Sequence, residues 1–320
     1  MPARYAAIGA ALLLAAAARA QTVPVSPVPL TGPPVAAEAP APPSPLWRKS
    51  GKAGLGINQA LLSDNWRGGG VNTIGFNSLL NVRANRRSRA HSFDNEADFL
   101  FAFSQTEGLG YRKGQDRLYL DTKYGWHMST HWDMFVSLNL LSQFALGYKY
   151  DKDAAGNERG RLASDFFAPA FITAAYGFEY KPVEWFHLRL APFAPRLTVV
   201  NRAGRFMEVL GDKPYGVNPG HSTRFELLAA QILAELDKNL SPSLNLKARY
   251  LLFANYRNIN SREIDHRLDV GLTAKVGKYI NVSVNGIALY DFDQDNALQY
   301  SQGLTLGIAY AFQNFVDEKK

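Results

Sequence analysis

Apolar and polar residues alternate over unusually long segments of this chain. In residues 166–180 every even position is apolar or aromatic, whereas the odd positions include Thr173 and Glu179. Successive side chains of a β-strand point to opposite faces, so such a segment has one apolar and one polar face. Strands of soluble sheets are usually about five or six residues long. The longer pattern predicts strands that cross a bilayer, with lipid outside and a polar interior.

Twelve segments with this alternation follow residue 46, joined in turn by short and long connections. Bacterial outer-membrane barrels share this arrangement, with tight periplasmic turns and longer external loops. An even number of strands returns both ends of the barrel to the periplasm. The sequence therefore predicts an all-β fold, a transmembrane antiparallel up-and-down β-barrel of about twelve strands. We expect the strands at about 47–61, 71–84, 93–104, 117–128, 132–149, 165–180, 185–199, 224–237, 243–257, 264–276, 280–292 and 301–313.

The apolar rows of the expected strands lack charged residues. The rows within 74–84 and 304–312 carry none, and a charge that faces lipid costs about 2–4 kcal/mol at the bilayer midplane. Aromatic residues gather where the rows end, with Trp126 and Trp132 beside a short turn and Tyr256 before a long loop. Two such belts mark the two water–lipid interfaces. The rival architecture, a soluble sandwich or lipocalin-like barrel, explains neither feature.

The first twenty residues have the pattern of a secretory signal peptide. Arg4 precedes an apolar run, and Ala18-Arg19-Ala20 is a small-x-small cleavage site, so the mature chain is expected to begin at Gln21. A linker with nine prolines follows, and its extended conformation could reach on the order of 80 Å. We expect a signal peptide at 1–20, a proline-rich disordered periplasmic linker at 21–46 and an outer-membrane β-barrel at 47–320.

Composition restricts the location and the partners. The chain has no cysteine, which removes disulfides and thiolate metal sites from an exported protein. Its net charge of +7 is spread along the sequence, so nucleic acid is not an expected partner. We expect the outer membrane of a Gram-negative bacterium, with contacts to its lipid and lipopolysaccharide and to the barrel-assembly machinery during biogenesis. Residues 21–46 are a candidate docking segment for a periplasmic partner, and no cofactor is expected.

The rows opposite the apolar ones carry charges of both signs in nearly equal number. A pore selective for one sign of ion would more naturally be lined with one charge. Balanced signs favour ion pairs across the lumen, because buried charges must satisfy one another. Twelve strands also predict a narrow or partly occluded lumen. The residues expected to line it are Arg83, Glu96, Asp98, Asp121, Lys123, Glu179, Arg189, Lys247, Arg249, Arg267 and Asp269.

Two prolines interrupt the expected strand at 185–199. Pro192 and Pro195 have no backbone donor for the hydrogen-bond ladder, so proline in a sheet belongs at edges or bulges. We expect a bulge or an early break there, opening into the loop at 200–223.

Catalytic sites find little support in the sequence, and we expect no enzyme. A lipid-facing phospholipase needs serine and histidine together on the outer face, but the rows beside His266 offer Tyr256 and Tyr290. His127 and His131 lie four residues apart, yet the zinc-protease motif requires a glutamate after the first histidine. We interpret the remaining candidates for a rim protease as ordinary loop residues: Asp165, Asp212, His221 and Glu263.

One loop is a weak candidate for a metal site. Asp291, Asp293 and Asp295 place three carboxylates two residues apart, as oxygen-binding cations prefer. The calcium-loop consensus requires glycine at the sixth position and glutamate at the twelfth, where this chain has Asn296 and Gln302. A solvated acidic loop is the favoured interpretation, and a divalent-ion site that bridges lipopolysaccharide is the alternative.

The start of the expected barrel carries a distinctive block. Trp47 is followed by Asn58-Gln59, then by Asn65-Trp66 and three glycines from Gly68. With this block and its glycine- and aromatic-rich last strand, the chain resembles an uncharacterised outer-membrane β-barrel family, catalogued as a domain of unknown function. The resemblance spans roughly residues 47–313. It implies an export-pathway barrel and supplies no activity or site residues.

Three functions remain open at this point. The first is a narrow channel or small-solute transporter whose path is shaped by the lumen charges. The second is a structural or interaction barrel with an occluded lumen, acting through a partner. The third is an outer-membrane hydrolase. A shared fold does not decide among them.

Overall fold

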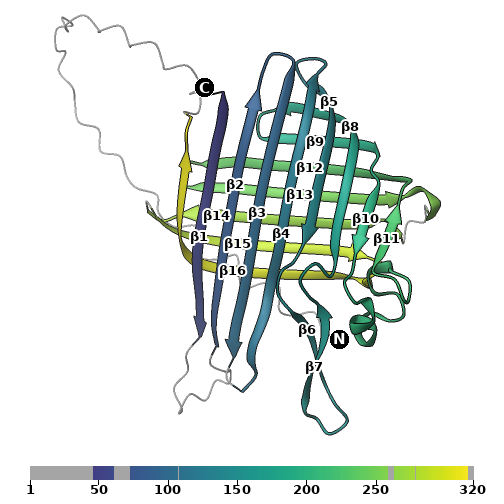
Figure 1. The fold of residues 1–320 in the computed structure, drawn as a ribbon. Coiled ribbons are helices and arrows are strands. Elements are labelled where there is room, and N and C mark those ends of the chain that lie inside the picture. The colour runs from purple at the N-terminus through teal and green to yellow at the C-terminus, as the bar shows by residue number, and fades with distance from the viewer. Residues whose placement is uncertain (1–45, 61–72, 107, 259–262, 278, 316–320) are drawn as a thin grey trace, which may run out of the picture. The chain divides into compact units, whose positions relative to one another are not determined.

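Twelve antiparallel strands close into a β-barrel in the computed structural model, which describes residues 46–60, 73–106, 108–258, 263–277 and 279–315 (Figure 1). Each strand pairs with the ones before and after it in the ring. The predicted twelve-stranded, up-and-down barrel is confirmed. The strands of the ring are β1 (Trp47–Ala60), β2 (Thr73–Arg87), β3 (His91–Thr106), β4 (Gly110–His127), β5 (Trp132–Ser142), β8 (Ala170–Val183), β9 (Phe186–Phe193), β12 (Ala229–Ser241), β13 (Leu244–Asn255), β14 (Asp265–Lys275), β15 (Ile280–Asp291) and β16 (Asp295–Gln313).

The barrel closes through the pairing of its first and last strands. Ser50 of β1 lies opposite Gln313 of β16, and the register continues to Ile57 opposite Leu306. A closed ring leaves no unpaired strand edge, so the wall satisfies its own backbone hydrogen bonds. The end of the barrel that holds the short turns and the start of β1 is called the turn end below. The opposite end is the loop end.

The barrel is polar inside and apolar outside. Lys123, Asp133 and Glu179 are almost fully buried, whereas Leu55 and Leu306 are 63% and 59% exposed. A water-soluble protein has the opposite distribution, because burying apolar surface drives its folding. The alternation in the sequence therefore appears in the structure as one wall with two chemically different faces.

Three loop-end connections differ from the sequence expectation. The predicted strand at 301–313 begins at Asp295, so a tight turn replaces the expected loop before it. The predicted strands at 93–104 and 117–128 extend to Thr106 and begin at Gly110, so a tight turn replaces the expected longer loop. The predicted strand at 132–149 ends at Ser142. The residues after it form a separate hairpin of β6 (Gly147–Lys152) and β7 (Glu158–Ser164). Strand pairing beyond the apolar rows explains the tight turns, because it depends on backbone geometry rather than on alternation.

The strand that contains the two prolines breaks as predicted. β9 ends at Phe193, and the chain resumes as β10 (Arg196–Val199), which pairs with the first residues of β8. β11 (Thr223–Glu226) pairs with β10, and two residues separate it from β12. The break shifts the alternation by one residue, since Arg189 and Ala191 are buried before it and Arg196 and Thr198 after it. After the break, the even-numbered residues Arg196 and Thr198 therefore face the lumen, where odd-numbered residues did before it.

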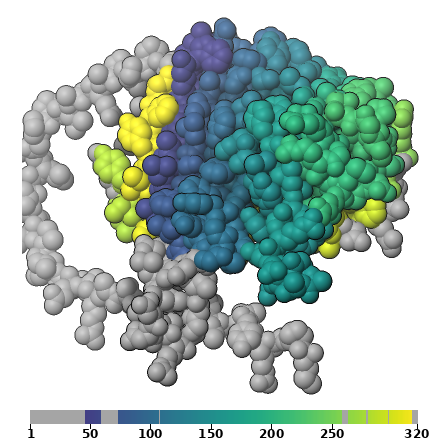
Figure 2. All heavy atoms as spheres, turned by 60° about the horizontal axis from the view of Figure 1, so that its bottom comes forward, coloured from purple at the N-terminus to yellow at the C-terminus, as the bar shows by residue number. Residues whose placement is uncertain are grey.

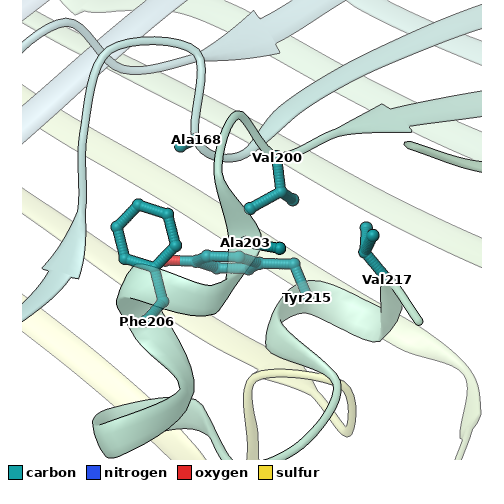
Figure 3. Close-up of a cluster of buried hydrophobic side chains, with 6 residues drawn as sticks. All are labelled: Ala168, Val200, Ala203, Phe206, Tyr215 and Val217. Carbon is teal, nitrogen blue, oxygen red and sulfur yellow. The ribbon is translucent and has the colours of Figure 1, made fainter. Parts of the chain in front are cut away.

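A small cap covers part of the loop end. It contains η1 (Ala203–Phe206), α1 (Met207–Leu210) and η2 (Pro214–Gly216). Phe206, Tyr215 and Val217 pack against Ala168 and Val200 in a buried apolar cluster (Figure 3). In Figure 2 the green cap lies beside the teal β6–β7 hairpin, and Arg161 of β7 donates a hydrogen bond to the Glu208 carbonyl over 3.0 Å. No helix of the described residues is long and apolar enough to cross a membrane.

Several sequence-based predictions lie outside the described residues. The signal peptide and nearly all of the linker fall in 1–45, and most of the distinctive opening block falls in 61–72. These assignments remain predictions.

Gly177 provides a test of the wall packing between β8 and β9. A Cβ atom at this position would lie 2.0 Å from the Leu190 carbonyl oxygen and 2.7 Å from the Ala191 Cα. Gly177→Ala should therefore lower the free energy of unfolding by about 1–3 kcal/mol, the usual cost of overpacking. Urea titration in detergent micelles, followed by tryptophan fluorescence, measures the change. Gly303→Ala is the control, because its Cβ would meet no atom within 4 Å, and equal losses in both variants would contradict the packing argument.

Candidate functional site

Ion pairs cross the lumen between strands that are far apart in the ring. Arg249 of β13 donates hydrogen bonds to Glu96 of β3 over 3.0 Å and to Glu235 of β12 over 2.7 Å. Its guanidinium also lies over Tyr119 of β4, 4.2 Å from the ring centroid. Charged donors make the strongest hydrogen bonds, and a cation is attracted to an aromatic face. Arg249 therefore connects opposite walls of the barrel at one level.

A second set of pairs crosses the lumen beside the first. Arg117 of β4 donates to Asp269 of β14 over 2.8 Å and to Asp98 of β3 over 2.5 Å. Arg267 of β14 donates to the same Asp269 over 2.8 Å. Two guanidiniums thus face two carboxylates, and the set is neutral. Neutrality is required here because an unpaired charge in such a place costs several kcal/mol.

A third set lies toward the turn end. Glu179 of β8 is fully buried and accepts hydrogen bonds from Lys123 of β4 at 2.6 Å and from Arg189 of β9 at 3.4 Å. Arg189 also donates to Asp121 of β4 over 2.8 Å. The ring of His187 places Nδ1 3.4 Å from Glu179. These paired side chains line this part of the lumen.

The ion pairs separate two cavities within the lumen. The turn-end chamber has a volume of about 460 Å³ and the loop-end chamber about 260 Å³. A space of about 30 Å³ lies between them, which is enough to hold ordered water. It is called the waist below, and its lining includes Arg117, Tyr119, Gln231, Leu233, Arg249 and Arg267. The waist shares Arg249 with the turn-end chamber and Arg267 with the loop-end chamber, so it is adjacent to both.

The structure brings the sequence-predicted lumen residues together in this interior. Glu179 is buried within the third set of pairs, and Arg267 lines the waist and the loop-end chamber. The other nine line the turn-end chamber: Arg83, Glu96, Asp98, Asp121, Lys123, Arg189, Lys247, Arg249 and Asp269.

Three important lumen residues were missed by the sequence-based list. Arg117 and Tyr119 lie on the same face of β4 as Asp121, so the alternation itself could have identified them. Arg196 could not be found in this way, because the break at Pro195 changes which residues face the lumen. The phase change is visible only in the strand pairing.

The residues considered for catalysis or metal binding are dispersed. Asp291 accepts hydrogen bonds from the Asp293 backbone and the Gln294 side chain, and Asp293 pairs with Arg224. The carboxylate of Asp295 accepts the Ala297 backbone N–H at 3.0 Å. Within the described part of the chain, no group of three or more potential metal ligands comes together.

The histidines and rim residues take part in local contacts. His266 Nδ1 lies 2.7 Å from the Tyr250 hydroxyl, and His127 Nδ1 lies 2.7 Å from Asp133. Asp165 pairs with Arg205 at 2.7 Å, and His221 contacts the Pro219 carbonyl at 3.2 Å. None of these contacts joins a histidine to a serine.

Comparison with known proteins finds a family model that matches part of the wall. Residues 57–148 match a family described as a protein of unknown function (DUF3078). The match confirms the expected resemblance to a domain family of unknown function and extends from β1 to the β6–β7 hairpin. None of the curated proteins compared matches the chain.

Solved structures similar to this one include outer-membrane barrels. An outer-membrane channel from Pseudomonas putida is 9% identical, with a TM-score of 0.36, over 87% of this chain and 99% of the other. The translocator domain of the autotransporter NalP from Neisseria meningitidis is 10% identical, with a TM-score of 0.34, over 83% and 88%. The Pseudomonas putida toluene transporter TodX is 9% identical, with a TM-score of 0.32, over 85% and 90%. Likeness this remote identifies no function.

Arg249 tests the energetic role of the crossing pairs. Replacing Arg249 by methionine removes the cation that Glu96 and Glu235 share, whereas Glu96 keeps Arg83 at 3.1 Å and Glu235 keeps Arg189 at 3.5 Å. We expect a loss of unfolding free energy of about 2 kcal/mol, less than for a buried charge left without any partner. Urea titration of the folded barrel in micelles measures it, with Lys149→Met on the exposed β6–β7 hairpin as the control.

The double variant Arg249→Met with Glu96→Gln should recover part of this stability, because it also removes one of the two carboxylates that lost the Arg249 charge. Additive losses in the double variant would show that the pair is not coupled.

Proposed function

We propose that this protein is an outer-membrane barrel that conducts small polar solutes through a lumen narrowed at the waist. The observation that carries the proposal is the succession of a polar chamber, a waist and a second polar chamber along the lumen. A barrel that served only as a plug would need no chamber at either end of its ion-pair layers.

The outer surface supports placement in a membrane. Leu138, Leu304 and Ile308 are each more than half exposed on the outer face, and water would oppose such a continuous apolar surface. Aromatic pairs lie near the turn end, with Tyr124 4.8 Å from Trp126 and Trp132 4.8 Å from Tyr180 between ring centroids. Aromatic rings of this kind favour the level of the lipid headgroups. In this orientation the turn end faces the periplasm and the loop end faces outward.

The predicted export signal and partners belong to the same proposal. A signal peptide at 1–20 would direct the chain across the inner membrane, and the barrel-assembly machinery would insert it. Lipid and lipopolysaccharide would surround the barrel, and the linker at 21–46 would extend from the turn end toward a periplasmic partner. The barrel would carry no catalytic chemistry of its own.

The narrow waist determines what could pass. Because the waist has a volume of only about 30 Å³, a solute with several heavy atoms would pass only when the side chains there move. Tyr119, Arg117 and Arg249 are held by side-chain contacts rather than by the backbone ladder. Side-chain rearrangement is much faster than opening of a strand pair. We therefore infer a low conductance governed by motion of these side chains.

The second candidate is an occluded barrel that acts through a partner. It is favoured by the ion pairs that cross the lumen at several levels. In this alternative the charges contribute only to stability.

Single-channel recording of residues 21–320 in planar bilayers distinguishes the two candidates. We expect small discrete conductance steps. Replacing Arg83, Lys123, Arg249 and Arg267 by glutamine should shift the ion selectivity toward cations, because acidic groups then dominate the lumen.

Lys149→Gln, on the exposed β6–β7 hairpin, removes a positive charge outside the lumen and should leave selectivity unchanged. Folding is checked beforehand from the shift in electrophoretic mobility on heating. A silent bilayer from folded protein would favour the occluded barrel and reject the channel.

A further inference from the structure

The loop-end chamber contains a buried carboxylate that lacks a positively charged partner. Asp291 is 6% exposed and lines the chamber. Its hydrogen bonds come from the neutral Gln294 amide and from the backbone N–H of Asp293. Among the described residues, no lysine, arginine or histidine lies within ion-pairing distance of it. A buried carboxylate without a cation is unfavourable by several kcal/mol.

The other charges around this chamber are paired. Asp116 binds Lys113 at 3.2 Å and accepts two backbone N–H groups. Arg117 and Arg267 belong to the neutral set around Asp269. Asp265 pairs with Arg196 at 2.8 Å. The lining itself holds three aspartates and three arginines. Lys113, Asp98 and Asp269 outside the lining complete the other pairs, so Asp291 is the carboxylate of the described lining that has no ion-pair partner.

Two buried polar atoms near this charge also lack partners. Arg196 lines the chamber and is 6% exposed, and its Nε–H finds no acceptor although Nη1 donates to Asp265. Gln231 lines the adjacent waist and is 5% exposed, and its side-chain oxygen accepts no hydrogen bond. Buried polar groups are rarely left unsatisfied, and such exceptions require an explanation. The Gln231 oxygen requires a donor, which a ligand with N–H groups would supply, whereas the Arg196 N–H requires an acceptor such as an ordered water.

We propose that the loop-end chamber binds a small organic solute with an ammonium group, with Asp291 as its counter-charge. The inference rests on the proposed channel, since the solute would enter this chamber first from the outside. An ammonium group supplies the missing positive charge and three donors. The Gln231 oxygen lies next along the path and accepts a donor from the same class of ligand.

The shape and lining of the chamber also fit such a solute. Its volume is about 260 Å³, and Phe171, Leu251 and Leu289 contribute apolar surface for a short carbon chain. Pockets for small molecules typically combine an apolar lining with a few placed polar groups. A bound metal ion fits less well, because hard cations require six or more oxygen ligands and the described residues offer no group of three acidic or histidine ligands.

The cap holds the outer boundary of this chamber. The Tyr215 hydroxyl donates to the Ala163 carbonyl over 2.7 Å. Burial, reinforced by the negative charge of Asp291, raises the pKa of Tyr215 well above its ordinary value. Tyr215 therefore remains a neutral donor and does not itself neutralise Asp291.

The test is titration calorimetry of the folded barrel, residues 21–320, in detergent micelles with putrescine. The neutral isostere 1,4-butanediol has the same carbon chain and tests the requirement for the ammonium group. Mg²⁺ tests whether any cation suffices. Putrescine should bind, with at least about tenfold weaker binding for both the diol and Mg²⁺, because a charged hydrogen bond is lost or the ligand geometry is wrong.

Asp291→Asn should weaken putrescine binding about tenfold or more, because it removes the counter-charge and keeps the shape of the side chain. Asp295→Asn is the matched control in the same turn, since Asp295 lies outside the chamber lining, and it should bind as the unaltered protein does. Heat-shifted mobility verifies that each variant is folded.

The proposal is overturned if putrescine and butanediol bind equally, if Mg²⁺ binds as tightly, or if the two variants behave alike. These results are independent of conductance. If putrescine binds without specificity but the barrel still shows conductance steps, the ammonium site is rejected and the channel is retained. Specific binding by a barrel that is silent in bilayers rejects the channel and leaves the site.

Discussion

Charges that point into this barrel must be neutralised by other charges inside it. The interior formed by twelve strands is too narrow to hydrate each group separately. At this diameter, side chains from opposite strands can reach each other, as Arg249 of β13 reaches Glu96 of β3. The cross-section of the lumen, the position of the waist and the separation of the two chambers all depend on these pairs.

The crossing pairs also explain why the two chambers differ. The turn-end chamber is surrounded by the extended set that includes Arg83, Glu96, Arg189 and Asp237, in which each charge has an opposite neighbour. At the loop end the wall is interrupted at Pro195 and completed by β10, β11 and the cap. Asp291 lies at the end of β15 in this chamber, where the described residues offer it no ion-pair partner.

Much of the wall could be predicted from the sequence, since alternation specifies both the existence of a strand and the face of each residue. Arg83, Asp121 and Arg249 were assigned to the lumen on this basis, and the structure places them there. Assigning faces by alternation fails where the alternation shifts by one residue. Counting from Arg189 assigns Arg196 to the lipid face, because alternation gives no sign of the residue added at the break.

Partners across the lumen could not be predicted at all. Alternation shows that Glu96 faces inward, but the cation that it meets depends on the tilt and closure of the whole barrel. The loop-end chamber was likewise beyond reach, because it is formed by segments distant in sequence, such as Phe171, Tyr215 and Asp291. The acidic turn was therefore interpreted from spacing alone, which gave no indication that Asp291 is buried.

The most direct test of a continuous path through the waist is chemical modification at Tyr119 during single-channel recording. The chain has no cysteine, so Tyr119→Cys introduces a single thiol between the two chambers. A small, positively charged methanethiosulfonate reagent added from either side should change the conductance of an open channel irreversibly. If the reagent fails from both sides while a cysteine in the turn-end chamber reacts, the waist is closed and the lumen is not a passage.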